Sequence, residues 1–191
     1  MSIKTGSEFI VEYLIRQGVK YIFGIPGHGC LGFTDALFKH KDEITLVQMK
    51  QEMAGVHMAV GYYRVTGQPL AVFTSIGPGA INTAIGLGDA YVDSMPVLVI
   101  TGDTHVHMRG KGVLQEIERN RDSSMLKVVD ALVKRSWHVA QAGQLPAILR
   151  RHRATRHRAS SRFRQARRRR NYGHPRMTLY RIPRRGLVGP T

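Results

Sequence analysis

Cysteine and long apolar runs are scarce in this sequence. Cys30 is the single cysteine among 191 residues, which excludes an intramolecular disulfide framework and is typical of a reducing compartment. The longest uncharged apolar stretch, residues 70–88, is broken by glycines and polar residues, so it does not resemble a membrane span. The N-terminus carries Glu8 and Glu12 in an amphipathic pattern, which excludes a signal peptide. We therefore expect a cytoplasmic protein with no membrane partner.

Acidic residues and lysine are absent from residues 151–191, which contain 14 arginines. Residues 1–150 carry 15 basic and 13 acidic side chains, so nearly all of the net charge of +16 belongs to the last segment. This distribution argues against a basic DNA-binding globule. It predicts an ordered domain over residues 1–150 and an Arg-rich tail over residues 151–191, through which alone the chain could bind nucleic acid.

Helical and strand-like patterns alternate through the first domain. Helices are predicted over residues 5–18, 31–38, 52–63 and 79–91, and strands over residues 19–25, 44–48, 70–74 and 97–101. Apolar strands with almost no polar alternation are typical of a parallel sheet buried between helices, so we predict an α/β fold with a parallel sheet flanked by helices. Ligands usually bind at the carboxyl ends of such strands, here the turns Gly24–Gly27, Gln51–Glu52, Ser75–Gly79 and Gly102–Asp103.

Two of these turns are rich in glycine, which allows a ligand to approach the backbone closely. They are Gly24–Gly29 and Ser75–Ala80, the second followed by Asn82. Neither has the glycine spacing of the dinucleotide fingerprint or the lysine of a P-loop. A tight turn between a strand and a helix, without any ligand, is the alternative interpretation.

Glu52 is the acid that stands out, because it lies between an apolar strand and an apolar helix start. A carboxylate in such a place is partly desolvated and can share a proton at neutral pH. An ordinary acid stabilised by the helix dipole is the alternative. His105 and His107 have no cysteine or carboxylate cluster beside them, so no metal site is expected.

Taken together, several motifs resemble the N-terminal pyrimidine-binding domain of thiamine diphosphate enzymes of the acetolactate synthase-like group. The resemblance runs from about Thr5 to Arg150, and its best-matched stretches are Gln51–Gly55, Ser75–Asn82, Gly88–Val97 and Thr101–Asp103. It implies that Glu52 is catalytic: it hydrogen-bonds the aminopyrimidine ring and promotes the imino tautomer. It implies a role for Gln115 near the substrate. The cofactor-binding residues that it implies are Gly24, Ile25, Pro26, Gly27, Glu52, Ser75, Gly77, Pro78, Gly79 and Asn82.

The resemblance also implies what a complete enzyme would need. In this family a further domain with a Gly-Asp-Gly…Asn motif holds Mg²⁺ and the diphosphate, and no such motif occurs here. The family's active site forms between two subunits, which implies a homo-oligomer or a separate diphosphate-domain subunit as partner. We thus expect a fragment of an enzyme that cleaves and joins C–C bonds of 2-keto acids, inactive alone. His28 and Gly102-Asp103-Thr104 are also similar to trihydroxycyclohexanedione hydrolases, an alternative within the superfamily.

The resemblance stops just after His152. The tail has three interpretations: a basic arm that binds nucleic acid, a disordered solvated segment, or an out-of-frame translation of a GC-rich gene. In each case we expect the closing strand of the family's domain to be lost, which would expose an apolar edge of the sheet.

Overall fold

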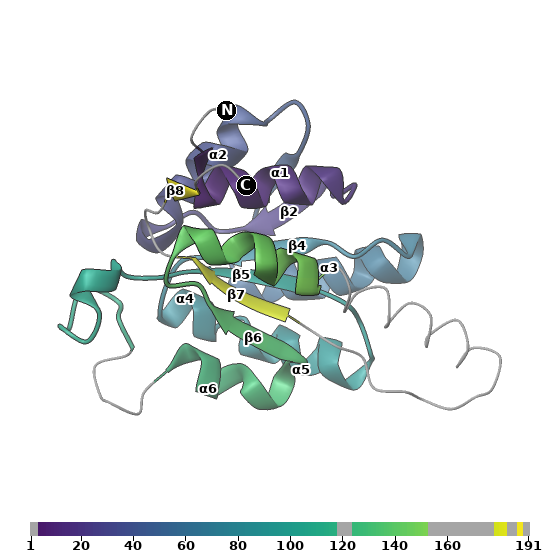
Figure 1. Ribbon diagram of the computed structural model, residues 1–191. Coiled ribbons are helices and arrows are strands. Elements are labelled where there is room, and N and C mark those ends of the chain that lie inside the picture. The colour runs from purple at the N-terminus through teal and green to yellow at the C-terminus, as the bar shows by residue number, and fades with distance from the viewer. Residues whose placement is uncertain (1–3, 118–123, 153–177, 183–186, 189–191) are drawn as a thin grey trace.

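A six-stranded sheet forms the centre of the protein, whose computed structural model describes residues 4–117, 124–152, 178–182 and 187–188 (Figure 1). The strands follow the order β3-β2-β4-β5-β7-β6, and every neighbouring pair is parallel. Their bounds are β2 (Tyr21–Gly24), β3 (Thr45–Gln48), β4 (Ala71–Thr74), β5 (Leu98–Gly102), β6 (Arg135–His138) and β7 (Thr178–Ile182). The predicted α/β fold with a parallel sheet is confirmed.

Helices cover both faces of this sheet. Figure 1 shows α1 and α2 on one side and α5 and α6 on the other. The helix bounds are α1 (Gly6–Arg16), α2 (Leu31–Lys39), α3 (Glu52–Thr66), α4 (Pro78–Ile81), α5 (Ala84–Val92) and α6 (Met125–Val129). Residues 145–152 are also helical and lie beside α1, where the Tyr13 hydroxyl donates to the Leu149 carbonyl at 3.4 Å. Short 3₁₀ turns complete the chain: η1 (His28–Cys30), η2 (Val106–Met108), η3 (Asp130–Leu132) and η4 (Ala142–Gln144).

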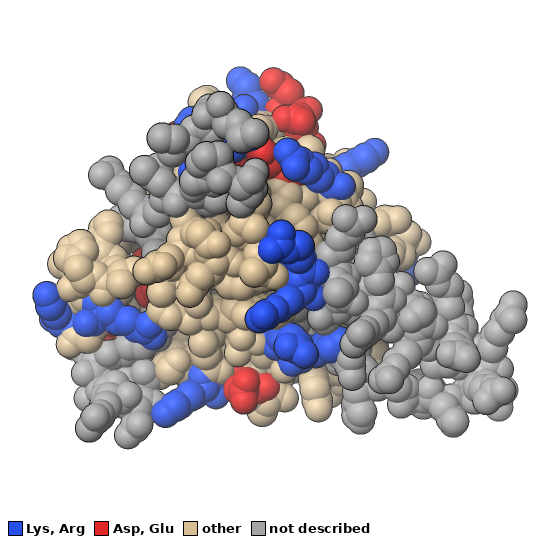
Figure 2. Space-filling view, viewed as in Figure 1, with Lys and Arg blue, Asp and Glu red and all other residues tan. Residues whose placement is uncertain are grey.

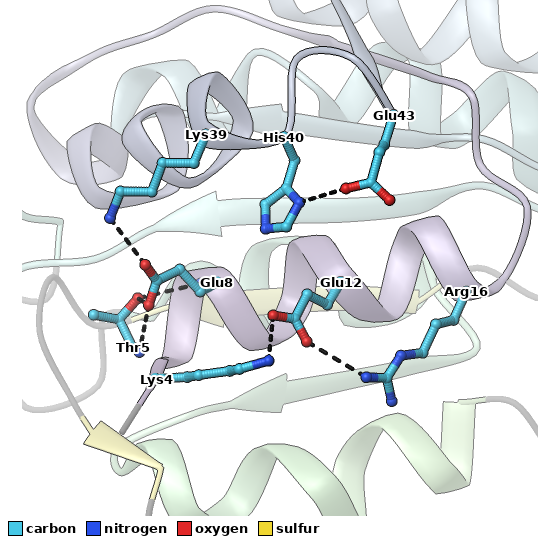
Figure 3. A network of polar contacts seen from close by, with 8 residues as sticks. All are labelled: Lys4, Thr5, Glu8, Glu12, Arg16, Lys39, His40 and Glu43. Carbon is cyan, nitrogen blue, oxygen red and sulfur yellow. Dashed lines mark hydrogen bonds and ion pairs between the residues drawn. The ribbon is translucent and has the colours of Figure 1, made fainter. Parts of the chain in front are cut away.

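The start of α1 is fixed by a capping box (Figure 3). The Glu8 backbone N–H donates to Thr5 Oγ1 at 3.2 Å, and the Thr5 N–H donates to Glu8 Oε2 at 2.8 Å. Lys39 of α2 lies 2.9 Å from Glu8 Oε1, so the same carboxylate joins two helices. The Thr5 N–H, followed by the Lys39 ammonium, lowers the pKa of Glu8 to about 2.

The core is closely packed around β4. Phe73 is fully buried, and its ring lies 5.3 Å from that of Phe33 on α2, measured between centroids. Gly24 leaves the space that the Phe73 ring occupies, because a Cβ at Gly24 would lie 2.1 Å from it. On the other face, Gly86 of α5 lets this helix approach Val56 of α3. Close packing here holds α3 and α5 against each other.

The predicted helix over residues 79–91 is two helices, α4 and α5. The break lies at Thr83, which is fully buried and whose hydroxyl donates to the Ala80 carbonyl at 2.7 Å. A threonine side chain that bonds a nearby carbonyl competes with the helical hydrogen-bond ladder. The hydrophobic spacing of the sequence does not reveal this local competition.

We expected the closing strand of the sheet to be lost, and this expectation is wrong. Residues 178–182 form β7 between β5 and β6, with Thr178 paired to both Leu98 and Arg135. A second short pair joins β1 (Lys4–Thr5) to β8 (Leu187–Val188) in antiparallel fashion. The sequence signal was missed because this β-branched and aromatic run lies among arginines. The predicted domain boundary at residue 150 and the expected disorder of the tail over residues 151–191 stay predictions, and residues 153–177, 183–186 and 189–191 of that tail lie outside the described residues.

Basic side chains are prominent on the face drawn in Figure 2, while acidic ones are few there. Arg135 on β6 and Arg150 and Arg151 at the end of the 145–152 helix are exposed. No described helix is long and apolar enough to cross a bilayer.

Candidate functional site

The turns that follow four adjacent strands meet at one edge of the sheet. Strands β3, β2, β4 and β5 are neighbours and parallel, so their carboxyl ends lie side by side. The Gly29 N–H donates to Ser75 Oγ at 3.3 Å, which joins the turn after β2 to the turn after β4. A Cβ at Gly102 would lie 2.5 Å from the Gly29 carbonyl, so the turn after β5 contacts the same place. The structure thus brings together the turns that the sequence singled out.

Glycine makes this convergence sterically feasible at Gly27. A Cβ at Gly27 would lie 2.6 Å from Ser75 Cβ, so no larger residue fits there unless the neighbouring atoms move. Ile25 and Pro26, which precede it, are half-buried, and the Ile25 N–H donates to the Phe73 carbonyl at 3.4 Å. The first turn is therefore fixed to β4 by its backbone.

Glu52 is the acidic group at this edge. It is the first residue of α3, after Gln51 in an extended conformation, and it is half-buried. Its Oε2 accepts a hydrogen bond of 2.6 Å from Asn82 Nδ2, and a Cβ at Gly79 would lie 3.0 Å from its Oε1. The helix dipole favours an anion at this position, and the amide of Asn82 orients it.

The turn after β4 is shaped by Gly77, which has φ +59° and ψ −117°. Pro78 follows as the first residue of α4. The first N–H of a helix has no acceptor within the helix, so the missing N–H of proline costs no hydrogen bond. This backbone turn places Gly79 beside Glu52 and directs Asn82 toward the same carboxylate. Glu52, Gly79 and Asn82, predicted separately from motif positions, form one contact group. Their binding roles stay a prediction.

Gln115 lies on the loop between η2 and α6, with an exposed side chain. Its backbone has φ +62°, an uncommon conformation for a residue with a side chain. A Cβ at Gly77 would lie 1.9 Å from the Gln115 carbonyl oxygen, so this loop rests directly on the turn after β4. The structure thus places Gln115 next to the candidate cofactor residues, and its role near a substrate is untested.

Two buried acids lie near the site: sequence reasoning missed Glu116 as a site residue and named Asp103 only as part of the turn Gly102–Asp103. Glu116 is 5% exposed and accepts hydrogen bonds from backbone N–H groups of its own loop. Asp103, at the end of β5, is 2% exposed and lies 3.1 Å from His138 Nε2 at the end of β6. For Glu116 the sequence signal was an acid within a glycine-rich loop. Asp103 and His138 are far apart in the sequence, so no local pattern indicates that they lie together. Within the described parts of the chain, no group of three or more histidine, cysteine or acidic residues is placed to hold a metal ion.

The family model for the thiamine pyrophosphate enzyme N-terminal TPP binding domain matches residues 4–134. The chain belongs to the thiamine pyrophosphate enzyme family. Its TPP binding domain is similar in sequence to acetolactate synthases. The chain is 37% identical over 149 residues to the acetolactate synthase isozyme 3 large subunit of Escherichia coli, and this alignment covers 78% of the chain and 25% of that protein.

Two further relatives are also acetolactate synthase large subunits. The acetolactate synthase large subunit of Buchnera aphidicola is 36% identical over 148 residues, which are 78% of this chain and 25% of the relative. A probable acetolactate synthase large subunit of Methanocaldococcus jannaschii is 32% identical over 145 residues, 76% of this chain and 23% of the relative. The chain thus spans about a quarter of the length of the curated relatives that it matches. These similarities give no support to a trihydroxycyclohexanedione hydrolase or to nucleic-acid binding.

Proposed function

We propose that the edge formed by Glu52, Asn82 and the turns Gly24–Gly27 and Ser75–Gly79 binds the aminopyrimidine of thiamine diphosphate. One observation carries the proposal: the Glu52 carboxylate is oriented by Asn82 at 2.6 Å and lies beside Gly79. A carboxylate so placed can share a proton with a ring nitrogen. Family membership supports the same cofactor.

The residues present fit a flat heteroaromatic ring. At Gly79 the absence of a side chain leaves the approach to Glu52 Oε1 open, since a Cβ there would lie 3.0 Å from that oxygen. The backbone N–H and carbonyl groups of the glycine turns offer polar contacts to the edges of a ring. The half-buried position of Glu52 keeps part of the water away from the shared proton.

When bound, thiamine diphosphate supplies the carbanion chemistry of C–C bond cleavage and ligation. In our proposal Glu52 is the catalytic residue, and it holds a proton at the ring nitrogen that faces its carboxylate. Asn82 keeps that carboxylate in one orientation through the bond to Oε2. We assign Gln115 to the substrate side, and its carbonyl oxygen rests against Gly77 beside the proposed cofactor residues.

We further propose that the parent activity is that of an acetolactate synthase-like enzyme acting on 2-keto acids in the cytoplasm. The relatives named above support this, and each is about four times as long as the part that matches. The diphosphate and Mg²⁺ would be held by a separate diphosphate-binding domain, in a homo-oligomer or in another subunit. The chain by itself is then a binding half-site without turnover.

A titration of the full chain with thiamine, which lacks the diphosphate, tests the proposed site. We expect wild type to bind with a dissociation constant of about 1 mM or tighter by calorimetry. Glu52→Gln should weaken binding by about tenfold or more, because a hydrogen bond to a charged group is lost. Glu43→Gln is the matched control, since Glu43 is an exposed acid that pairs with His40 away from this edge.

Inorganic pyrophosphate is the second ligand to titrate, because the arginines of residues 151–191 could bind it. Its affinity should be the same for wild type and Glu52→Gln. Two results would contradict the proposal: thiamine that does not bind wild type, or thiamine that binds Glu52→Gln as well as wild type.

A further inference from the structure

The loop over residues 110–116 is organised by a buried acid. Glu116 Oε2 accepts hydrogen bonds from the backbone N–H groups of Gly112 at 2.9 Å and Val113 at 3.3 Å. The Gly110 N–H donates to the other carboxylate oxygen, Oε1. Glu116 is 5% exposed, although Gly110, Gly112 and Gln115 around it are exposed. Backbone N–H groups thus supply the hydrogen bonds that water would make to an exposed carboxylate. Through them the carboxylate holds three residues of one loop together.

The loop backbone is bent in a way that needs this support. Gly110, Gly112 and Gln115 have φ values of +77°, +71° and +62°. Glycine adopts these values readily, but for Gln115 the conformation is costly and persists only when its surroundings enforce it. The Glu116 N–H also donates to the Val113 carbonyl at 3.0 Å, so the residue after Gln115 closes the turn with both backbone and side chain.

The bent loop is in direct contact with the candidate cofactor turn. A Cβ built at Gly77 would lie 1.9 Å from the Gln115 carbonyl oxygen. Gly79, two residues further along, lies beside the Glu52 carboxylate. A change in the shape of the loop therefore reaches the turn that faces Glu52.

We propose that Glu116 is a positioning residue, whose carboxylate holds the loop over residues 110–116 in the form that sets Gln115 against Gly77. In this way it closes the substrate side of the half-site without contacting a ligand itself. The inference rests on the proposed function only for the identity of the ligand, because the loop geometry is independent of it.

Glu116→Gln is the informative variant, because it keeps the size of the side chain and removes its charge. A glutamine has one acceptor oxygen and an NH₂ group that cannot accept, so it can keep either the Gly110 donor or the Gly112 and Val113 donors, but not both sets. Lys111→Gln is the matched control: it also removes one charge from the same loop, but Lys111 is exposed. Glu116→Asp, which keeps the charge on a shorter side chain, serves as the rescue variant.

Amide hydrogen exchange of the full chain is the first readout. In Glu116→Gln we expect at least one of the amides of Gly110, Gly112 and Val113 to exchange about tenfold faster, in line with the loss of a charge-assisted hydrogen bond. Glu116→Asp should give an intermediate rate, and Lys111→Gln should match wild type. Unchanged exchange in Glu116→Gln, or an equal change in Lys111→Gln, would overturn the positioning role.

Thiamine affinity is the second readout, together with the melting temperature. A positioning role predicts that thiamine affinity falls about threefold or more in Glu116→Gln and is partly recovered in Glu116→Asp, whereas a merely structural role would lower the melting temperature and leave the affinity of the folded protein unchanged. Affinity equal to that of wild type would refute the link from Glu116 to the site. If wild type fails to bind thiamine, the proposed function fails, and hydrogen exchange still decides whether Glu116 holds the loop.

Discussion

Gly77→Ala tests the contact between the turn after β4 and the Gln115 loop. The added Cβ would lie 1.9 Å from the Gln115 carbonyl oxygen, whereas ordinary contacts begin at 3.4 Å, so one backbone segment would move by the difference of 1.5 Å. The φ of +59° adds about 1–3 kcal/mol of conformational strain for a residue with a side chain. Overpacking adds about 1–3 kcal/mol, so we expect a total loss of about 2–6 kcal/mol of unfolding free energy.

Gly67→Ala is the matched control for this prediction. Gly67 ends α3 with φ +69° and has nothing within 4 Å of a built Cβ, so alanine there costs only the left-handed conformation, about 1 kcal/mol. Urea unfolding followed by the fluorescence of Trp137, the single tryptophan, measures both variants. A Gly77→Ala loss no larger than that of Gly67→Ala would refute the close contact.

Three further changes follow from the described contacts. Glu8→Gln should cost about 1 kcal/mol at neutral pH, because it removes the charge from the α1 cap. Since the folded state lowers the pKa of Glu8 from 4.5 to about 2, this stabilisation is complete above the unfolded value and is lost as pH falls between the two. The difference between variant and wild type in urea should therefore shrink as pH falls below about 4.5 and approach zero only at about pH 2, and a constant difference would contradict the assignment. Phe73→Ala should cost about 3–5 kcal/mol, since the ring is fully buried, and a loss below about 1 kcal/mol in the same assay would be inconsistent with that burial. Asn82→Asp should weaken thiamine binding by about tenfold in calorimetry by placing a second carboxylate against Glu52, and undiminished affinity would speak against their contact.

The sheet and its first helices could be predicted from local pattern, because each strand is an apolar run closed by a turn. The β2, β3 and β4 strands fall within the predicted ranges, β5 ends one residue beyond its range, and α3 begins at Glu52 as expected. By contrast, β6 has polar and basic residues at Arg135 and His138, so its sequence gives no apolar run. An edge strand needs fewer apolar residues than a central one, which explains the missed element.

The candidate site was partly predictable for a different reason. Glu52, Ser75–Gly79 and Asn82 stand at strand ends or helix starts, and the topology of a parallel sheet gathers such positions. Glu116 was not predictable as a positioning residue, because its importance comes from three backbone donors that only the folded loop aims at it. Residues 178–182 were missed as a strand because their short β-branched and aromatic run lies among arginines, and their place between β5 and β6 depends on pairing over a long sequence separation.

Amide NMR shifts of the full chain during a thiamine titration test the central claim most directly. The account predicts that the amide resonances of Gly27 and Gly79 shift along one saturable curve, while those of Gly18 and Gly67 stay fixed. Gly18 follows the end of α1, and Gly67 ends α3 at the opposite end from Glu52. Shifts at Gly18 and Gly67 without shifts at Gly27 and Gly79 would contradict a pyrimidine site at the carboxyl ends of these strands.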